Sequence, residues 1–280
     1  MSNTSLPPYS VLMSVYLKDK PEFLDAAIES MVGQTEPFFD MVLVCDGPLG
    51  EDVETCVSRW QRALGNRLNV VRLEENHGLG FALNVGLEKC RCGIVARMDA
   101  DDISRPERCR KLLQRMTEED LALIGGAIEE FDKKPGDMGA VRMPPLTQCE
   151  INMRLKRRNP FNHMSVMFDR NMVKKAGGYE PFPWMEDYWL WVRMIAQGCK
   201  CANLPDIIVD ARTGEGMYAR RSNMAYLRSQ VSFFHELKKL GLVNCFEETK
   251  AIVERTIATV LPTDVVKMVY NKLLRERSAD

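Results

Sequence analysis

The sequence predicts an α/β fold in which a mostly parallel sheet is flanked by helices and followed by a helical C-terminal extension. Two observations predict this fold. In the first half, short apolar runs alternate with amphipathic stretches of about 10 to 15 residues, which is the pattern of successive β-α units. Polar side chains also recur just after the apolar runs, and open parallel sheets bind their ligands at that edge.

The first predicted unit begins with the apolar run 9–16, which is typical of a strand buried on both faces. Pro21 is placed where a first helical turn would begin, because its fixed φ suits that position. Apolar side chains then recur at helical spacing up to Gly33, which ends the helix. A second unit follows in the same way, with a strand at 41–44 and a helix that ends at Gly65.

The next units have the same pattern. The strand 68–73 leads through a polar glycine turn into a helix from about 81 to 90. The strand 94–98 leads into an acidic stretch and then a helix at 106–116, before a fifth strand at 121–128.

The second half begins with a Pro- and Gly-containing connection at 132–145, which we interpret as a seam within one compact unit. Thr147 and Glu150 form a capping-box pattern, which predicts a helix from Gln148 to about Arg158. The remaining predicted elements are a strand at 163–168, a helix between Tyr188 and Gly198, a strand at 207–211, and helices at 222–240, 246–260 and 263–276.

Composition narrows the classes of function. A net charge of −1 argues against nucleic-acid binding, which needs a strong basic excess. No apolar run approaches the roughly 18 to 20 residues that cross a bilayer, and the start of the sequence does not resemble a signal peptide, so we expect a cytoplasmic protein. The nine cysteines include no C-x-x-C pair, which indicates reduced thiols.

The acidic stretch that follows residues 94–98 is the first candidate site. Asp99, Asp101 and Asp102 come directly after a buried strand, where negative charge is costly unless a cation neutralises it. In an extended segment Asp99 and Asp101 share one side, and two carboxylates suit Mg²⁺ or Mn²⁺ shared with a diphosphate. The alternative is an acidic loop that caps the next helix.

Two further polar residues follow predicted strands. Asp46 comes after the second strand and Asn76 after the third, so both are expected at the same sheet edge as Asp99. A carboxylate at Asp46 can accept a hydrogen bond from an imide nitrogen, which favours uracil. The alternative for Asp46 is a turn-forming role before Gly47, and Asn76 is also an ordinary turn residue.

The ordered set of motifs resembles the family-2 glycosyltransferases of the GT-A fold, the inverting class that uses nucleotide sugars. The resemblance runs from residue 10 to about residue 221. Its motifs are Ser14-Val15-Tyr16, Asp46-Gly47, Asn76-x-Gly78, Asn84-x-Gly86, Asp99-Ala100-Asp101-Asp102 with Pro106, and Glu186-Asp187-Tyr188.

The resemblance implies a role for each matching residue. The residues implied to hold UDP are Ser14, Tyr16, Asp46, Asn76, Asn84, Asp99 and Asp101. Asp99 and Asp101 would also hold Mn²⁺ or Mg²⁺, with Asp101 as the direct ligand. Asp187 would be the base that takes the proton of the acceptor hydroxyl, and Glu186 would orient the acceptor or the helix. Asp102 is instead expected to help start the helix at Pro106.

The family also guides the domain prediction. We expect a glycosyltransferase domain over 1–221, with a nucleotide half at about 1–131, an acceptor half at about 145–221, and the extension at 222–280. Some relatives have a histidine as a further metal ligand, but this sequence has none at 210–214, so water or Asp210 would complete the shell.

The similarity extends to bacterial exopolysaccharide and O-antigen galactosyltransferases through residues 159–168 and 216–221. It implies a UDP-sugar donor, with galactose favoured as the hexose. The implied acceptor is a saccharide, in particular a lipid-diphosphate-linked intermediate of cell-surface polysaccharide.

Several residues keep two interpretations. His163 either contacts a substrate or has a structural partner, and Trp184 is a candidate platform for a sugar ring. Arg212, Arg220 and Arg221, with the loop 214–218, either close over the diphosphate or are solvated.

The C-terminal helices also keep two interpretations. They combine apolar faces with basic side chains, namely Lys238, Lys239, Lys267, Lys272, Arg275 and Arg277, and residues 154–158 add a further basic cluster. Attachment to the inner membrane face and ordinary packing or a homodimer contact are both consistent with this pattern.

Two rival functions lack the sequence features that would support them. A sugar nucleotidyltransferase would need a glycine-rich loop after the first strand, and residues 16–20 contain no glycine. A binding or scaffold subunit without turnover would be favoured by the loss of Asp101 or Asp187, and both are present.

Overall fold

The computed structural model describes residues 5–213 and 224–260. The chain divides into two compact units, one formed by Met1–Pro181 with Met185–Gly214 and the other by Phe182–Trp184 with Glu215–Asp280. The domain boundary predicted between residues 221 and 222 lies outside the described residues.

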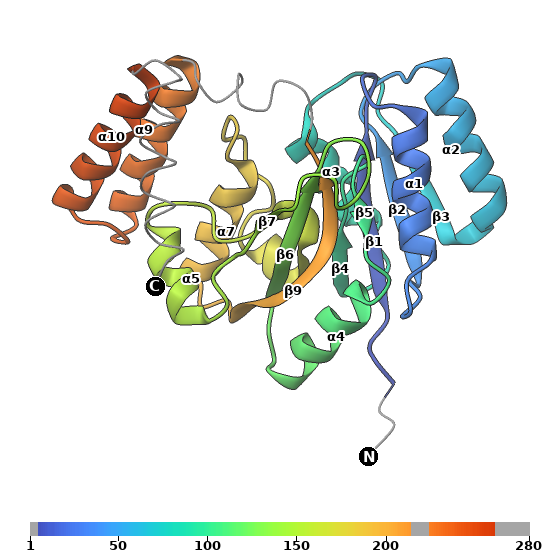
Figure 1. Ribbon diagram of the computed structural model, residues 1–280, viewed down its shortest axis with the longest axis horizontal. Helices are drawn as coiled ribbons and strands as arrows, with labels where there is room; N and C mark the ends of the chain where they lie inside the picture. Colours follow the sequence, from blue (N-terminus) through green and yellow to red (C-terminus); the bar gives the residue numbers. More distant parts are fainter. Residues whose placement is uncertain (1–4, 214–223, 261–280) are drawn as a thin grey trace. The chain divides into compact units, whose positions relative to one another are not determined.

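In the described part of the first unit, nine strands form one sheet, in the order β3-β2-β1-β4-β8-β6-β9-β5, with β7 paired to β6 (Figure 1). The strands are β1 Tyr9–Val15, β2 Asp40–Cys45, β3 Leu68–Arg72, β4 Ile94–Arg97, β5 Ile103–Ser104, β6 Leu123–Phe131, β7 Ala140–Arg142, β8 Met167–Asp169 and β9 Cys201–Arg212. The first four are parallel, β8 is antiparallel to both β4 and β6, and β9 is parallel to β6. Strands β1 to β4, β6 and β9 therefore run in one direction, which confirms the mostly parallel sheet.

Helices connect these strands. They are α1 Pro21–Val32, α2 Glu51–Leu64, α3 Leu79–Lys89, α4 Arg108–Glu118, α5 Gln148–Leu155, α6 Arg170–Lys175 and α7 Glu186–Ala196, with short 3₁₀ turns at Gly65–Arg67 and His163–Ser165. Pro21 is the first residue of α1, and the predicted capping box of Thr147 and Glu150 is present at α5. These two helix starts are confirmed.

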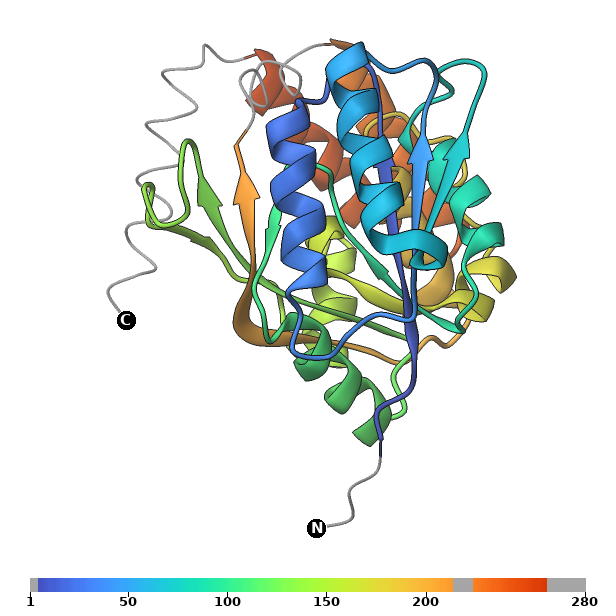
Figure 2. The same ribbon diagram turned by 90° about the vertical axis from the view of Figure 1, so that its right-hand side faces the viewer.

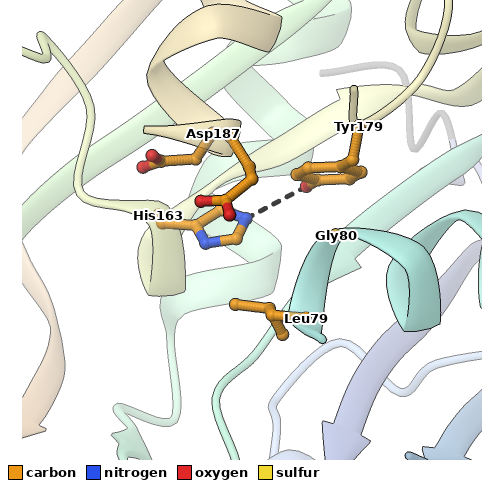
Figure 3. A pocket seen from close by; sticks show the side chains of 6 residues that line it. Leu79, Gly80, His163, Tyr179 and Asp187 are labelled. Carbon is orange, nitrogen blue, oxygen red and sulfur yellow. Dashed lines mark hydrogen bonds between the residues drawn. The ribbon is translucent and has the colours of Figure 1, made fainter. Parts of the chain in front are cut away.

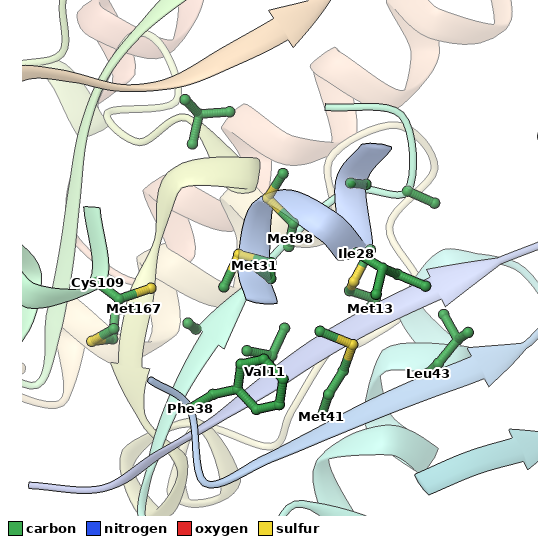
Figure 4. Packing of buried hydrophobic residues seen from close by; sticks show 14 of the residues in the cluster. Val11, Met13, Ile28, Met31, Phe38, Met41, Leu43, Met98, Cys109 and Met167 are labelled. Atoms are coloured by element: carbon green, nitrogen blue, oxygen red, sulfur yellow. The ribbon is translucent and has the colours of Figure 1, made fainter. Parts of the chain in front are cut away.

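Strands β1, β2 and β4 are largely buried on both faces, whereas the edge strand β3 leaves Asn69 and Arg72 exposed. Val11, Met13 and Met41 point into a cluster with side chains of α1, α2 and α4 (Figure 4), and Figure 2 shows α1 and α2 side by side over the sheet. Leu12 faces the other side, toward α3. A Cβ atom at Gly86 of α3 would lie 2.4 Å from Leu12 Cδ1, so this helix packs directly on the strands. The sheet is thus sandwiched between helices, as the apolar runs predicted.

The second half of the sheet differs from its prediction. The segment 163–168 begins as a 3₁₀ turn and joins the sheet only as β8. The connection 132–145 contains the hairpin strand β7, and β9 is longer than the predicted strand 207–211. Helix α7 begins at Glu186 rather than after Tyr188. Strands of two or three residues are too short to show an alternating hydrophobic pattern, which explains why the sequence did not predict β5 and β7.

The described part of the second unit contains α9 Met224–Lys239 and α10 Cys245–Val260, which pack on each other. Lys238 lies 2.8 Å from Glu248 across this pair. The helix predicted at 263–276 lies outside the described residues. No helix within the described residues is long and apolar enough to cross a bilayer.

Candidate active site

Three carboxylates gather where β4 ends. Oxygen atoms of Asp99, Asp101 and Asp102 all lie within 4.8 Å of one another. Burial, together with the charge of Asp99, raises the pKa of Asp101 to about 6. Just after β1, burial and the charges of Asp101 and Asp99 raise the pKa of Asp19 to about 6, although the backbone N–H of Tyr16 donates to its carboxylate. This much negative charge in one place calls for a cation.

Asp102 is the most buried member of this cluster. Burial, with the charges of Asp99 and Asp101, raises its pKa well above the usual range. One of its oxygens accepts a hydrogen bond of 2.7 Å from the backbone N–H of Arg212, and the other has no hydrogen-bond partner among the described residues. An unpartnered buried oxygen beside two carboxylates fits a divalent cation. The helix expected at Pro106 begins two residues later, at Arg108, and the hydrogen bond of Asp102 comes from Arg212 rather than from that helix, so a structural role for Asp102 at the helix start stays a prediction.

A buried arginine compensates part of the negative charge. Arg97 is the last residue of β4 and forms an ion pair with Asp99. Its charge also lowers the pKa of Asp101 and of Asp187, against the larger effect of burial on both. Arg97 therefore couples the acidic cluster electrostatically to the start of α7.

The candidates on β9 have structural partners. Asp210 lies 2.6 Å from Arg105 in an ion pair and is not a member of the acidic cluster, so this arrangement does not support Asp210 as a metal ligand. The guanidinium of Arg212 lies over the rings of Phe23 and Phe131, and its Nε donates to the carbonyl of Asp101. Arg212 thus supports the acidic loop, which neither predicted role described.

Asp46 organises the turn that leads into α3. Its two carboxylate oxygens accept hydrogen bonds from the backbone N–H groups of His77 and Gly78, at 2.8 and 3.0 Å. The side chain of Asn76 donates to the carbonyl of Asp46 at 3.1 Å. Both residues therefore lie at the predicted sheet edge and have a structural role there, and their contacts with uracil or ribose stay a prediction.

Replacing Gly47 by Ala is expected to destabilise this turn. Gly47 has φ +87°, and a Cβ atom there would lie 2.8 Å from the backbone nitrogen of Asn76. The expected loss is roughly 1 to 3 kcal/mol of unfolding free energy, because a positive φ and a backbone clash add together. Denaturant unfolding measures it. Gly136→Ala is the matched control, since Gly136 has φ +84° with nothing within 4 Å of an added Cβ. Equal losses in the two variants would contradict the clash.

The other predicted nucleotide residues are placed as follows. Ser14 is half-buried in β1, and Tyr16, which follows that strand, is 39% exposed. The side chain of Asn84 holds Tyr179 by two hydrogen bonds of 2.8 Å, one to its carbonyl and one from its N–H. Asn84 thus joins α3 to the segment before α7, and its contact with a nucleotide stays a prediction.

A small pocket of about 40 Å³ lies where α3 and α7 begin (Figure 3). It is lined by Leu79, Gly80, His163, Tyr179, Glu186 and Asp187. A volume of this size admits a hydroxyl group or a few waters. Burial raises the pKa of Asp187 and of Glu186 from their ordinary values. A half-buried carboxylate with a raised pKa that lines a pocket is a candidate general base.

His163 is a neutral partner in this pocket. Burial, with the charge of Arg97, lowers its pKa well below the ordinary range. Its Nε2 lies 3.0 Å from the hydroxyl of Tyr179, as Figure 3 shows. His163 therefore has a specific hydrogen-bond partner, Tyr179, as its structural interpretation requires.

The remaining candidates are not placed in the site. Trp184 is 46% exposed and belongs to the second unit, where its ring lies against that of Tyr226. Arg220, Arg221 and the loop 214–218 lie outside the described residues.

Comparison with known proteins identifies the family. The sequence profile described as Glycosyl transferase family 2 matches residues 10–176, more than half of the chain. The chain belongs to glycosyl transferase family 2. The amylovoran biosynthesis glycosyltransferase AmsE of Erwinia amylovora is 38% identical, over 94% of this chain and 98% of the relative. The UDP-Gal:alpha-D-GlcNAc-diphosphoundecaprenol beta-1,3-galactosyltransferase of Escherichia coli is 32% identical, over 96% of this chain and 97% of the relative.

Solved structures place this family 2 glycosyltransferase in the GT-A fold. S. aureus TarS 1-349 in complex with UDP-GlcNAc superposes with a TM-score of 0.68 at 16% identity, over 92% of this chain and 77% of that chain. The mannosyltransferase PcManGT from Pyrobaculum calidifontis, in complex with GDP-Man and Mn²⁺, gives 0.64 at 15% identity, over 97% and 81%. At these identities the likeness establishes the fold alone.

Sequence reasoning missed four residues of this candidate site. Arg97 could have been found from the sequence, because a charged residue at the end of an apolar strand is costly to bury and therefore indicates a charged partner nearby. Asp19, after the first strand, repeats the polar pattern of the sheet edge. Asn159 and Tyr179 lie on irregular segments, and no spacing rule brings them to Asp187 or His163.

Proposed function

We propose that this chain is an inverting, metal-dependent glycosyltransferase that transfers a hexose from a UDP-sugar to a saccharide acceptor. The observation that carries the proposal is the carboxylate cluster at the end of β4, with its unpartnered Asp102 oxygen. Asp99 and Asp101, with Asp102 beside them, would hold Mn²⁺ or Mg²⁺. A cation bound there would neutralise the charge that develops on the diphosphate leaving group.

The base is assigned to Asp187. In a direct displacement, the acceptor oxygen attacks the anomeric carbon while the bond from that carbon to the UDP oxygen breaks, and the hydroxyl proton passes to Asp187. The small pocket beside Asp187 suits one hydroxyl of the acceptor. Glu186, on the same first turn of α7, would orient the acceptor. Burial lets Asp187 accept a proton more readily than an exposed carboxylate would, because its pKa is raised.

The substrates are inferred from the relatives. The Escherichia coli galactosyltransferase is named for UDP-galactose and a diphosphoundecaprenol-linked GlcNAc, and AmsE for amylovoran biosynthesis. We infer galactose as the hexose and a lipid-diphosphate-linked saccharide as the acceptor, within the synthesis of a cell-surface polysaccharide.

A panel of donors tests the inferred donor sugar. UDP-galactose, UDP-glucose, UDP-GlcNAc and GDP-mannose are each incubated with the protein and Mn²⁺, with and without EDTA. We expect consumption of UDP-galactose that EDTA abolishes, and consumption of GDP-mannose alone would refute the UDP preference.

Binding of the donor is expected to depend on pH. Asp101 has a pKa of about 6 without a cation, so protons compete with the metal below that pH. Mn²⁺-supported affinity for UDP-galactose should fall about tenfold between pH 7.5 and pH 5, the effect of one proton on a group of this pKa. Isothermal titration calorimetry measures the fall, and the same titration without Mn²⁺ is the control. An affinity that stays constant over this range would contradict the role of Asp101.

A further inference from the structure

The amide of Asn159 has a defined orientation beside Asp187. Its Oδ1 accepts a hydrogen bond of 3.1 Å from the backbone N–H of Phe161. The other end of the amide, Nδ2, donates to Asp187 Oδ2 at 2.7 Å. Because an N–H group can only be paired with the oxygen of the amide, the contact with Phe161 fixes which end faces Asp187. Asn159 therefore presents a donor to the carboxylate.

The segment that carries Asn159 is anchored to the sheet. The side chain of Asn203, on β9, donates to the carbonyl of Pro160 at 3.2 Å, and Asn162 donates to the carbonyl of Gly126, on β6, at 3.0 Å. The ring of Phe161 is buried, with its centre 5.8 Å from that of Trp191 on α7. These contacts hold the amide in place, so its position does not depend on a bound substrate.

We propose that Asn159 is a positioning residue for the base: through its hydrogen bond to Oδ2 it favours the ionised form of Asp187 and fixes the orientation in which this carboxylate takes the proton of the acceptor hydroxyl. The inference rests on the proposed function of Asp187. A donor to a carboxylate stabilises the charged form, which is otherwise disfavoured in a buried pocket.

The groups around Asp187 act in both directions. Burial raises its pKa, and the hydrogen bonds from the backbone N–H of Tyr188 and from Asn159 lower it, as does the charge of Arg97. Glu186 and Tyr179 also face this carboxylate, and their own pKa values are raised in part by its charge. His163, in the same pocket, is neutral and adds no charge. The hydrogen bond from the neutral side chain of Asn159 thus offsets part of the rise that burial causes in the pKa of Asp187.

The test compares the pH dependence of transfer in Asn159→Ala, Asn159→Asp and the wild type. Donor and Mn²⁺ are kept saturating at every pH, so that protonation of Asp101 does not limit the rate. Under these conditions the rate rises with pH as Asp187 ionises, and the acid limb of the kcat profile reports this carboxylate. Loss of the donor should move that limb upward by about one pH unit in Asn159→Ala. The added negative charge in Asn159→Asp should move it further. In both variants the rate should recover toward the wild-type plateau at high pH.

Asn162→Ala is the matched control. Asn162 anchors the same segment by donating to backbone carbonyls and not to Asp187, so this variant should lower thermal stability and leave the acid limb in place. Titration of the Asp187 carboxyl by ¹³C NMR, assigned with Asp187→Asn, gives a second readout that needs no turnover. An acid limb and a carboxyl titration at the wild-type pH in both Asn159 variants would overturn the inference. Absence of transfer by the wild type would instead overturn the proposed function, and the NMR titration would still decide the role of Asn159.

Discussion

Replacing Asp187 by Asn is expected to lower sugar transfer by roughly 10²- to 10⁴-fold, the usual contribution of a general base. The substitution keeps the size of the side chain but removes its ability to take the acceptor proton. Affinity for UDP-galactose with Mn²⁺ should stay close to that of the wild type, because the cation cluster is formed by other residues. Transfer rates and calorimetry on the same preparation measure the two effects.

This experiment can refute the assignment of Asp187 as the general base. An Asp187→Asn variant that binds the donor normally and still transfers sugar at the wild-type rate would show that another group takes the proton. Glu186 is the nearest alternative, since it lines the same pocket. Glu186→Gln is therefore the comparison variant, and its loss of rate should be smaller than that of Asp187→Asn.

Replacing Asp101 by Ala is expected to abolish the strengthening of UDP binding by Mn²⁺ and to lower transfer at least about a hundredfold. Asp101 belongs to the acidic cluster, and its pKa of about 6 shows how strongly the site resists uncompensated charge. Calorimetric titration of UDP with and without Mn²⁺ measures the loss of binding.

Asp210→Asn is the control for this variant. Asp210 is a buried carboxylate on β9 whose partner is Arg105, so its substitution should lower stability without removing the effect of Mn²⁺. If Asp101→Ala retained the Mn²⁺ effect while Asp210→Asn lost it, the cation site would have been assigned to the wrong carboxylate.

The residues at the carboxyl edge of the sheet were predictable from the sequence, because the parallel strands that end there are visible as apolar runs separated by helices. Strands β1, β2 and β4 are largely buried on both faces, so each reads as an apolar run with a polar residue after it. The edge strand β3 is only partly buried and is also followed by a polar turn. Asp46, Asn76 and Asp99 follow from this pattern, since parallel strands end at one edge. The pattern places residues at the edge but not their partners, which is why the structural bonds of Asp46 to His77 and Gly78 were not foreseen.

The second half of the site was less predictable for a physical reason. Asn159, His163 and Tyr179 lie on turns whose conformation depends on tertiary contacts, such as the two bonds from Asn84 to the backbone of Tyr179. Local spacing carries no information on such contacts. The motif that contains Asp187 could be recognised only through its resemblance to the family, and its hydrogen bond to Asn159 needed the structure.

The most direct test of the central claim is the stereochemical outcome of transfer. UDP-α-galactose and an alkyl-diphosphate-linked GlcNAc acceptor are incubated with the protein and Mn²⁺, and the anomeric proton coupling of the product is read by ¹H NMR. We predict a β-linked galactoside that forms with Mn²⁺, fails to form with EDTA, and is lost in Asp187→Asn. An α-linked product, or transfer that proceeds unchanged without a divalent cation, would contradict the account of an inverting, metal-dependent transferase.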